Sequence, residues 1–179
     1  MAWALVHLAG NGERTPSFTD AQSAYESQMS LWGAVAGGAN FVYHAAGWLE
    51  GGLSSSFDKF ILDIEQLQML AETLQPVGAT DDDFALDAVT EAGPGGHFFA
   101  TQHTMARYKD AFYSPIVSDW RNFGTWSADG AKTATQRATS VWRAILQDFA
   151  PPPMDPAVME ALEAFRRRRT EEGGAPPAG

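Results

Sequence analysis

Residues 40–57 read Asn-Phe-Val-Tyr-His-Ala-Ala-Gly-Trp-Leu-Glu-Gly-Gly-Leu-Ser-Ser-Ser-Phe, an order that predicts a strand, a glycine-rich loop and a helix start. The apolar run over residues 39–45 is continuous, which is typical of a parallel strand covered on both faces. His44 stands near its end, and Trp48 follows in the loop. In barrels of such βα units, functional side chains stand at the carboxyl ends of the strands. His44 and Trp48 are therefore candidate site residues.

Apolar spacing, capping residues and helix breakers predict helices on both sides of this unit. One covers residues 21–36, with a capping box at residues 19–22 and two glycines that stop it. The longest runs from serines 54–56 to Pro76, with an apolar stripe that is expected to face the core: Phe60, Ile64, Leu67, Ala71 and Leu74. Further helices are predicted over residues 80–92 and 97–113, after a capping box at 133–136, and over 155–169. Helix dominates, and the strands are too few to close a barrel alone.

The composition limits the classes of function. The 179 residues carry 22 acidic and 12 basic side chains, for a net charge of −10. A nucleic-acid partner needs a basic face and is not expected, and solubility explains the acidity better than a cationic ligand does. The absence of cysteine excludes disulfides and thiolate zinc sites. Residues 1–10 are too short for a membrane span and lack the basic start of a signal peptide, so a cytoplasmic protein without a membrane partner is expected.

Two aromatic residues around His44 suggest one kind of ligand. Tyr43 and Trp48 have the chemistry of an aromatic cage, which holds a quaternary ammonium by cation–π attraction. The structural alternative is that Trp48 covers the core and that His44 is a satisfied polar group. These two interpretations stay open on the residues alone.

Two other motifs favour structural interpretations. Aspartates 81–83 are interpreted as helix capping rather than as a metal site, because consecutive helical residues point in different directions. Gly-Pro-Gly-Gly at residues 93–96 lacks the Gly-Lys-Ser/Thr ending of a phosphate-binding loop, so a tight turn is favoured over a ligand loop. The histidine spacing fits no zinc motif. No metal site and no catalytic residue are assigned.

Several motifs together resemble the trimethylamine methyltransferase family. They are Asp-Ala-Gln-Ser-Ala-Tyr-Glu at 20–26, Gly-Gly-Ala-Asn-Phe-Val-Tyr-His-Ala-Ala-Gly-Trp-Leu-Glu-Gly-Gly-Leu at 37–53, Gly-Pro-Gly-Gly-His-Phe at 93–98 and Pro-Pro-Pro-Met-Asp-Pro at 151–156. The resemblance concerns the C-terminal part of the family's longer chains. It implies an α/β fold, in which this chain is the helix-rich C-terminal portion of a (β/α)8 TIM barrel and is too short to close the barrel alone. Residues 1–150 would belong to the barrel, 151–169 to a helical extension and 170–179 to a disordered tail.

The resemblance also implies a function. The family moves a methyl group from a tertiary or quaternary methylated amine to the cobalt of a corrinoid that a partner protein carries. No cofactor is therefore expected to bind this chain directly. The matching motifs imply that the amine is faced by Tyr43, His44 and Trp48. A surface turned toward the corrinoid protein would be shaped by Gly95, Gly96 and His97.

Because the family's chains are more than twice as long, two hypotheses are carried forward. In the first, the chain is an enzyme subunit that becomes active with a separate chain supplying the N-terminal barrel, or through self-association. In the second, it is a non-catalytic truncated paralogue that acts as an interaction module.

Overall fold

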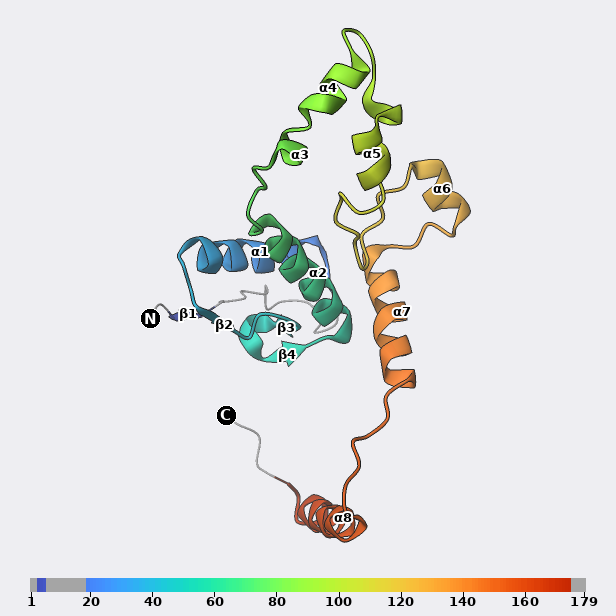
Figure 1. Ribbon diagram of the computed structural model, residues 1–179. Helices are drawn as coiled ribbons and strands as arrows, with labels where there is room; N and C mark the ends of the chain where they lie inside the picture. Colours follow the sequence, from blue (N-terminus) through green and yellow to red (C-terminus); the bar gives the residue numbers. More distant parts are fainter. Residues whose placement is uncertain (1–2, 6–18, 175–179) are drawn as a thin grey trace. The chain divides into compact units, whose positions relative to one another are not determined.

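The computed structural model describes residues 3–5 and 19–174 (Figure 1). The chain divides into two compact units, residues 1–144 and 145–179. Helix dominates, as predicted, and the strands among the described residues form two sheets of two strands each. Within the described ranges these strands close no barrel, so the barrel stays a prediction.

The first unit contains the predicted strand before His44. Strand β1 (Trp3–Leu5) pairs in parallel with β2 (Phe41–Tyr43), and helix α1 (Ala21–Ala36) lies between them in the chain. The strand prediction is confirmed, but the expected cover on both faces is wrong. Phe41 and Tyr43 are each 59% exposed. Both side chains stand on the same face of β2, and within the described residues this face is left largely uncovered.

A small antiparallel hairpin connects this sheet to the longest helix. Strand β3 (Trp48–Leu49) leads through the turn η1 (Glu50–Gly52) to β4 (Ser54–Ser55), which pairs with it. Helix α2 (Phe57–Thr73) follows at once. The Ser56 hydroxyl accepts a hydrogen bond from the Lys59 backbone N–H, which confirms the predicted serine cap.

Helices α1 and α2 contact each other through faces that the apolar spacing did not predict. The buried positions of α1 are Ser23, Ser27, Leu31 and Ala34, and those of α2 are Lys59, Ile61, Asp63, Glu65 and Leu70. The expected core stripe of α2 is therefore wrong: Ile64 and Leu67 are half-buried, and Phe60, Ala71 and Leu74 are exposed. Hydrogen bonds among the buried polar groups make their burial possible, because a paired polar group can leave water at low cost.

The N-terminal cap of α1 also differs from the prediction. Asp20, not Thr19, caps the helix by accepting a hydrogen bond from the Ser23 N–H.

The region after α2 contains short helices in place of two longer predicted ones. The predicted helix over 80–92 is broken at Ala85, whose φ is 50°, into α3 (Asp81–Phe84) and α4 (Leu86–Ala92). Thr80 and Asp83 form a reciprocal capping box, which confirms the capping interpretation of the aspartates. Residues 97–113 contain a short turn, η2 (Phe98–Ala100), and α5 (Gln102–Arg107) rather than one helix.

A second core joins α2 to the end of the first unit. Helices α6 (Phe123–Ala128) and α7 (Ala134–Gln147) follow, and Ile61, Val117 and Ala138 form a buried apolar cluster. The buried Glu65 carboxylate accepts backbone N–H bonds from Val117 at 2.9 Å and Ser118 at 3.1 Å. Thr133 and Gln136 exchange the two bonds of the predicted capping box.

The second unit contains α8 (Pro156–Glu171), which Asp155 caps at its predicted start. The helix extends two residues past its predicted end at Arg169, and residues 175–179 of the predicted tail lie outside the described residues. Among the helices described, none has both the length and the apolar content to span a membrane.

Candidate functional site

The candidate site lies in the loop between β2 and the β3–β4 hairpin. Two of its residues, His44 and Gly47, take left-handed backbone conformations with φ of 59° and 84°. Glu50, at the hairpin turn, has φ of 52°. Such a conformation costs a non-glycine residue about 1–3 kcal/mol and persists only where its surroundings fix it. The loop is therefore a constrained structure, of the kind that often carries function.

Of the three side chains that the sequence proposed for one site, His44 contacts the other two here. The Tyr43 and His44 rings meet edge to face with centroids 4.1 Å apart, and the His44 and Trp48 rings are 5.0 Å apart. Tyr43 and His44 are exposed, and Trp48 is half-buried. We call Tyr43, His44 and Trp48 the aromatic cluster. Its accessible ring faces could hold an organic cation by cation–π attraction.

Gly47 fixes the middle of this loop. Its N–H donates to the Asp63 carboxylate at 2.8 Å, and its carbonyl accepts from the Ser56 N–H at 3.0 Å. A Cβ at this position would lie 3.2 Å from two atoms of Phe60. Close packing and positive φ together favour glycine here.

Behind Gly47 lies a buried charged pair on α2. Lys59 and Asp63 are 1% and 0% exposed, one turn apart, and the ammonium contacts both carboxylate oxygens at 2.5 and 2.6 Å. The same ammonium donates to the Ser27 hydroxyl of α1 at 2.5 Å. Periodicity did not predict this network, since charged residues on a helix normally face solvent. The sequence feature that could have indicated this pair is the i,i+4 spacing of two opposite charges. The same spacing is common on exposed helix faces, so by itself it does not indicate burial.

The second predicted group, Gly95, Gly96 and His97, lies in the turn between α4 and η2. Gly95 has φ of 73°. A Cβ on Gly96 would come 1.9 Å from the Ala92 carbonyl oxygen, so the turn requires glycine for steric reasons. His97 is exposed, with its ring 5.4 Å from that of Phe99. In the residues that the structure describes, no ring contact or hydrogen bond links this turn to the aromatic cluster.

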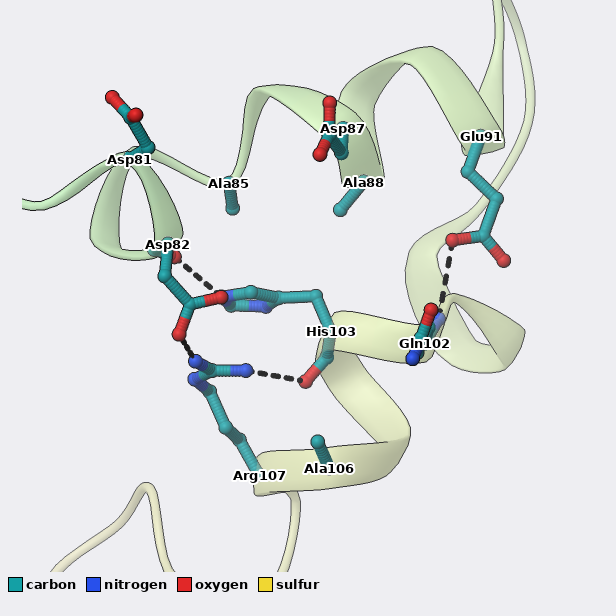
Figure 2. A pocket seen from close by; sticks show the side chains of 10 residues that line it. All are labelled: Asp81, Asp82, Ala85, Asp87, Ala88, Glu91, Gln102, His103, Ala106 and Arg107. Carbon is teal, nitrogen blue, oxygen red and sulfur yellow. Dashed lines mark hydrogen bonds and ion pairs between the residues drawn. The ribbon is translucent and has the colours of Figure 1, made fainter.

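Sequence reasoning missed a cavity of about 560 Å³ between α3–α4 and α5 (Figure 2). Asp82 closes one side by pairing with Arg107 and by accepting from His103 Nε2 at its carbonyl oxygen, 3.0 Å away. Glu91 accepts from the Gln102 N–H at 3.1 Å, and Asp81 and Asp87 point away from these contacts (Figure 2). Thr80 hydrogen bonds lower the pKa of the nearby Asp83 carboxyl. Within residues 3–5 and 19–174, no three histidine or acidic side chains gather as metal ligands.

Comparisons with known proteins place the chain among relatives. The family model described as trimethylamine methyltransferase matches residues 8–174. A glycine betaine methyltransferase of Desulfitobacterium hafniense is 38% identical over 166 residues, which cover 93% of this chain and 34% of the relative. Trimethylamine methyltransferases of Desulfitobacterium hafniense and Methanosarcina mazei are 29% and 28% identical, over 87% and 82% of this chain and 31% and 29% of theirs. The chain thus spans about a third of the length of the curated relatives it matches.

Proposed function

Because the chain belongs to the trimethylamine methyltransferase family, we propose that it supplies part of an enzyme that transfers a methyl group from a methylated amine to a corrinoid protein. The observation that carries this proposal is the aromatic cluster directly after β2. It lies within the matched residues, and its chemistry suits a methylated ammonium group. The amine would be tertiary or quaternary, in line with the names of the relatives.

The chain's own part in such a reaction would be to bind and orient the amine. Trp48 and Tyr43 would face the cationic methyl groups, an attraction of about 0.5–1 kcal/mol at an exposed site and about 2 kcal/mol when desolvated. His44, held by the left-handed turn, would orient a carboxylate or a water molecule beside them. The corrinoid of the partner protein would supply the cobalt that accepts the methyl group. Positioning a reactive group in line with its acceptor can lower a barrier without a protein nucleophile.

We further propose two protein partners. The turn formed by Gly95, Gly96 and His97 would face the corrinoid protein, as the resemblance implies. A separate chain would complete a (β/α)8 barrel around the β1–α1–β2 unit. Supporting this second partner, α1 exposes large apolar side chains: Tyr25 at 56%, Met29 at 71% and Trp32 at 41%. Exposed apolar patches are typical of interaction surfaces.

The test combines this chain with the N-terminal two-thirds of the Desulfitobacterium hafniense glycine betaine methyltransferase. Calorimetry on the complex measures binding of glycine betaine and of trimethylamine, with each chain alone as a control. Turnover is measured by mass spectrometry of the demethylated amine after adding the corrinoid protein. Binding and turnover only in the complex would support the proposal, and a complex that binds neither amine would refute it.

Binding of the corrinoid protein without turnover would support the interaction module instead. If this chain alone assembles into an oligomer that binds the amine, a second copy takes the role proposed for the separate chain. Sedimentation of the chain alone, with and without glycine betaine, separates these outcomes.

A further inference from the structure

The carboxylate of Asp63 links the inside of the α1–α2 pair to the loop that carries the aromatic cluster. It accepts from Gly47 N–H on one side and from the Lys59 ammonium on the other. Asp63 is fully buried, so neither contact competes with bulk water. A buried acceptor that is shared in this way holds its donors in one geometry.

Gly47 cannot easily move away from this contact. Phe60 packs against its Cα side, and the Ser56 N–H holds its carbonyl. The left-handed residue His44 precedes it and Trp48 follows it directly. The fixed Gly47 peptide therefore constrains the backbone that leads from His44 to Trp48.

We propose that Asp63 is a positioning residue for the aromatic cluster, acting through the hydrogen bond from the Gly47 N–H and held in place by Lys59 and Ser27. Its role as an aid to amine binding rests on the proposed function. Its role in fixing the loop does not. The two are tested by separate measurements.

The first measurement uses NMR on the full chain. In the wild-type protein, a scalar coupling across the hydrogen bond should connect the Gly47 amide nitrogen to the Asp63 side-chain carboxyl carbon. Gly47 should also exchange its amide hydrogen slowly. A folded wild-type chain with a rapidly exchanging Gly47 amide and no coupling would overturn the proposal without any variant.

The second measurement compares two variants of similar shape that have an amide or two methyl groups at residue 63. Lys59→Met with Asp63→Asn keeps an acceptor for Gly47 without the charges, and Lys59→Met with Asp63→Leu keeps the shape without the acceptor. We expect Gly47 exchange to be at least about ten-fold faster in the Leu variant, since its N–H then lacks a partner. Equal exchange in two folded variants would show that Asp63 does not position the loop.

The third measurement addresses the amine. In the complex with the complementing chain, glycine betaine should bind about ten-fold more weakly to the Leu variant than to the Asn variant, at unchanged affinity between the two chains. Equal amine affinity would overturn the role in binding. A wild-type complex that binds no amine would count against the proposed function, while the NMR measurements would still decide the positioning role.

Discussion

At the scale of single residues, the site depends on a few backbone positions that ordinary side chains avoid. His44 combines a positive φ with ring contacts to Tyr43 and Trp48. An outlier of this kind is the starting point for a functional hypothesis, and the ligand-facing role of His44 is proposed on that ground.

Trp48→Ala should weaken binding of glycine betaine to the complemented protein by roughly ten-fold, because a cation–π contact is lost. Trp48→Phe should lose less, since an aromatic face remains. Calorimetry on the complex measures both affinities. Unchanged affinity in Trp48→Ala would show that the indole covers the core and does not touch the amine.

Sequence reasoning identified the aromatic cluster but not its support. The end of a predicted strand locates Tyr43, His44 and Trp48 because strand and loop patterns are local. Asp63 is different. Its burial depends on Ser27 of α1 and Gly47 of the loop meeting the Lys59–Asp63 pair of α2, and no local pattern encodes that meeting.

At the scale of secondary structure, several helix starts were predictable and buried faces were not. The caps at Ser56, Asp155 and the 133–136 box are satisfied within about one turn, so neighbouring residues determine them. Which face is buried depends on the partner helix. The apolar residues Tyr25 and Met29 stay exposed while Ser27 is buried against α2.

Glu65 anchors the segment before α6 to α2, and its carboxylate should be needed for that contact. Glu65→Gln turns an acceptor oxygen into an NH₂ donor that faces the N–H groups of Val117 and Ser118. The free energy of unfolding should fall by about 1–3 kcal/mol. Urea denaturation measures it, with the exposed Glu72→Gln as the matched control. Equal stability of the two variants would contradict an anchoring role.

The same segment before α6 contains a pH-sensitive pair. Hydrogen bonds from Arg121, at 2.7 and 2.9 Å, lower the pKa of Asp119 to about 2 from 3.8. Because the folded pKa is the lower one, this pair stabilises the fold above about pH 4, and the contribution disappears as the pH falls toward 2. A carbon-13 NMR titration should find the Asp119 midpoint near 2. Arg121→Gln should move it upward and Arg143→Gln should not.

At the scale of the whole molecule, the described residues expose many large apolar side chains. Those of α1, Met29 and Trp32, and the β2 side chains Phe41 and Tyr43 are all more than 40% exposed. A chain with such surfaces is expected to associate with another. Its charge of −10 opposes unspecific aggregation but does not cover these side chains.

Met29→Ser with Trp32→Ser should weaken association with the complementing chain by at least about ten-fold, through the loss of buried apolar area. Biolayer interferometry measures the affinity. Met159→Ser, which replaces an exposed methionine of α8, is the control and should bind as the unmodified chain does. A double variant with undiminished affinity would show that this face of α1 is not the interface.

The parallel pairing of β1 with β2 also bears on the order of folding. Trp3 pairs with Phe41, so pairing of the two strands closes a chain loop that contains the whole of α1. Closing such a long loop is slower than forming a helix, whose contacts are local. The hairpin and α2 should therefore form early, and the backbone turn at His44 should reach its final geometry in a late kinetic phase. During synthesis and refolding, the last part of the first unit to mature would be the part for which amine binding is proposed.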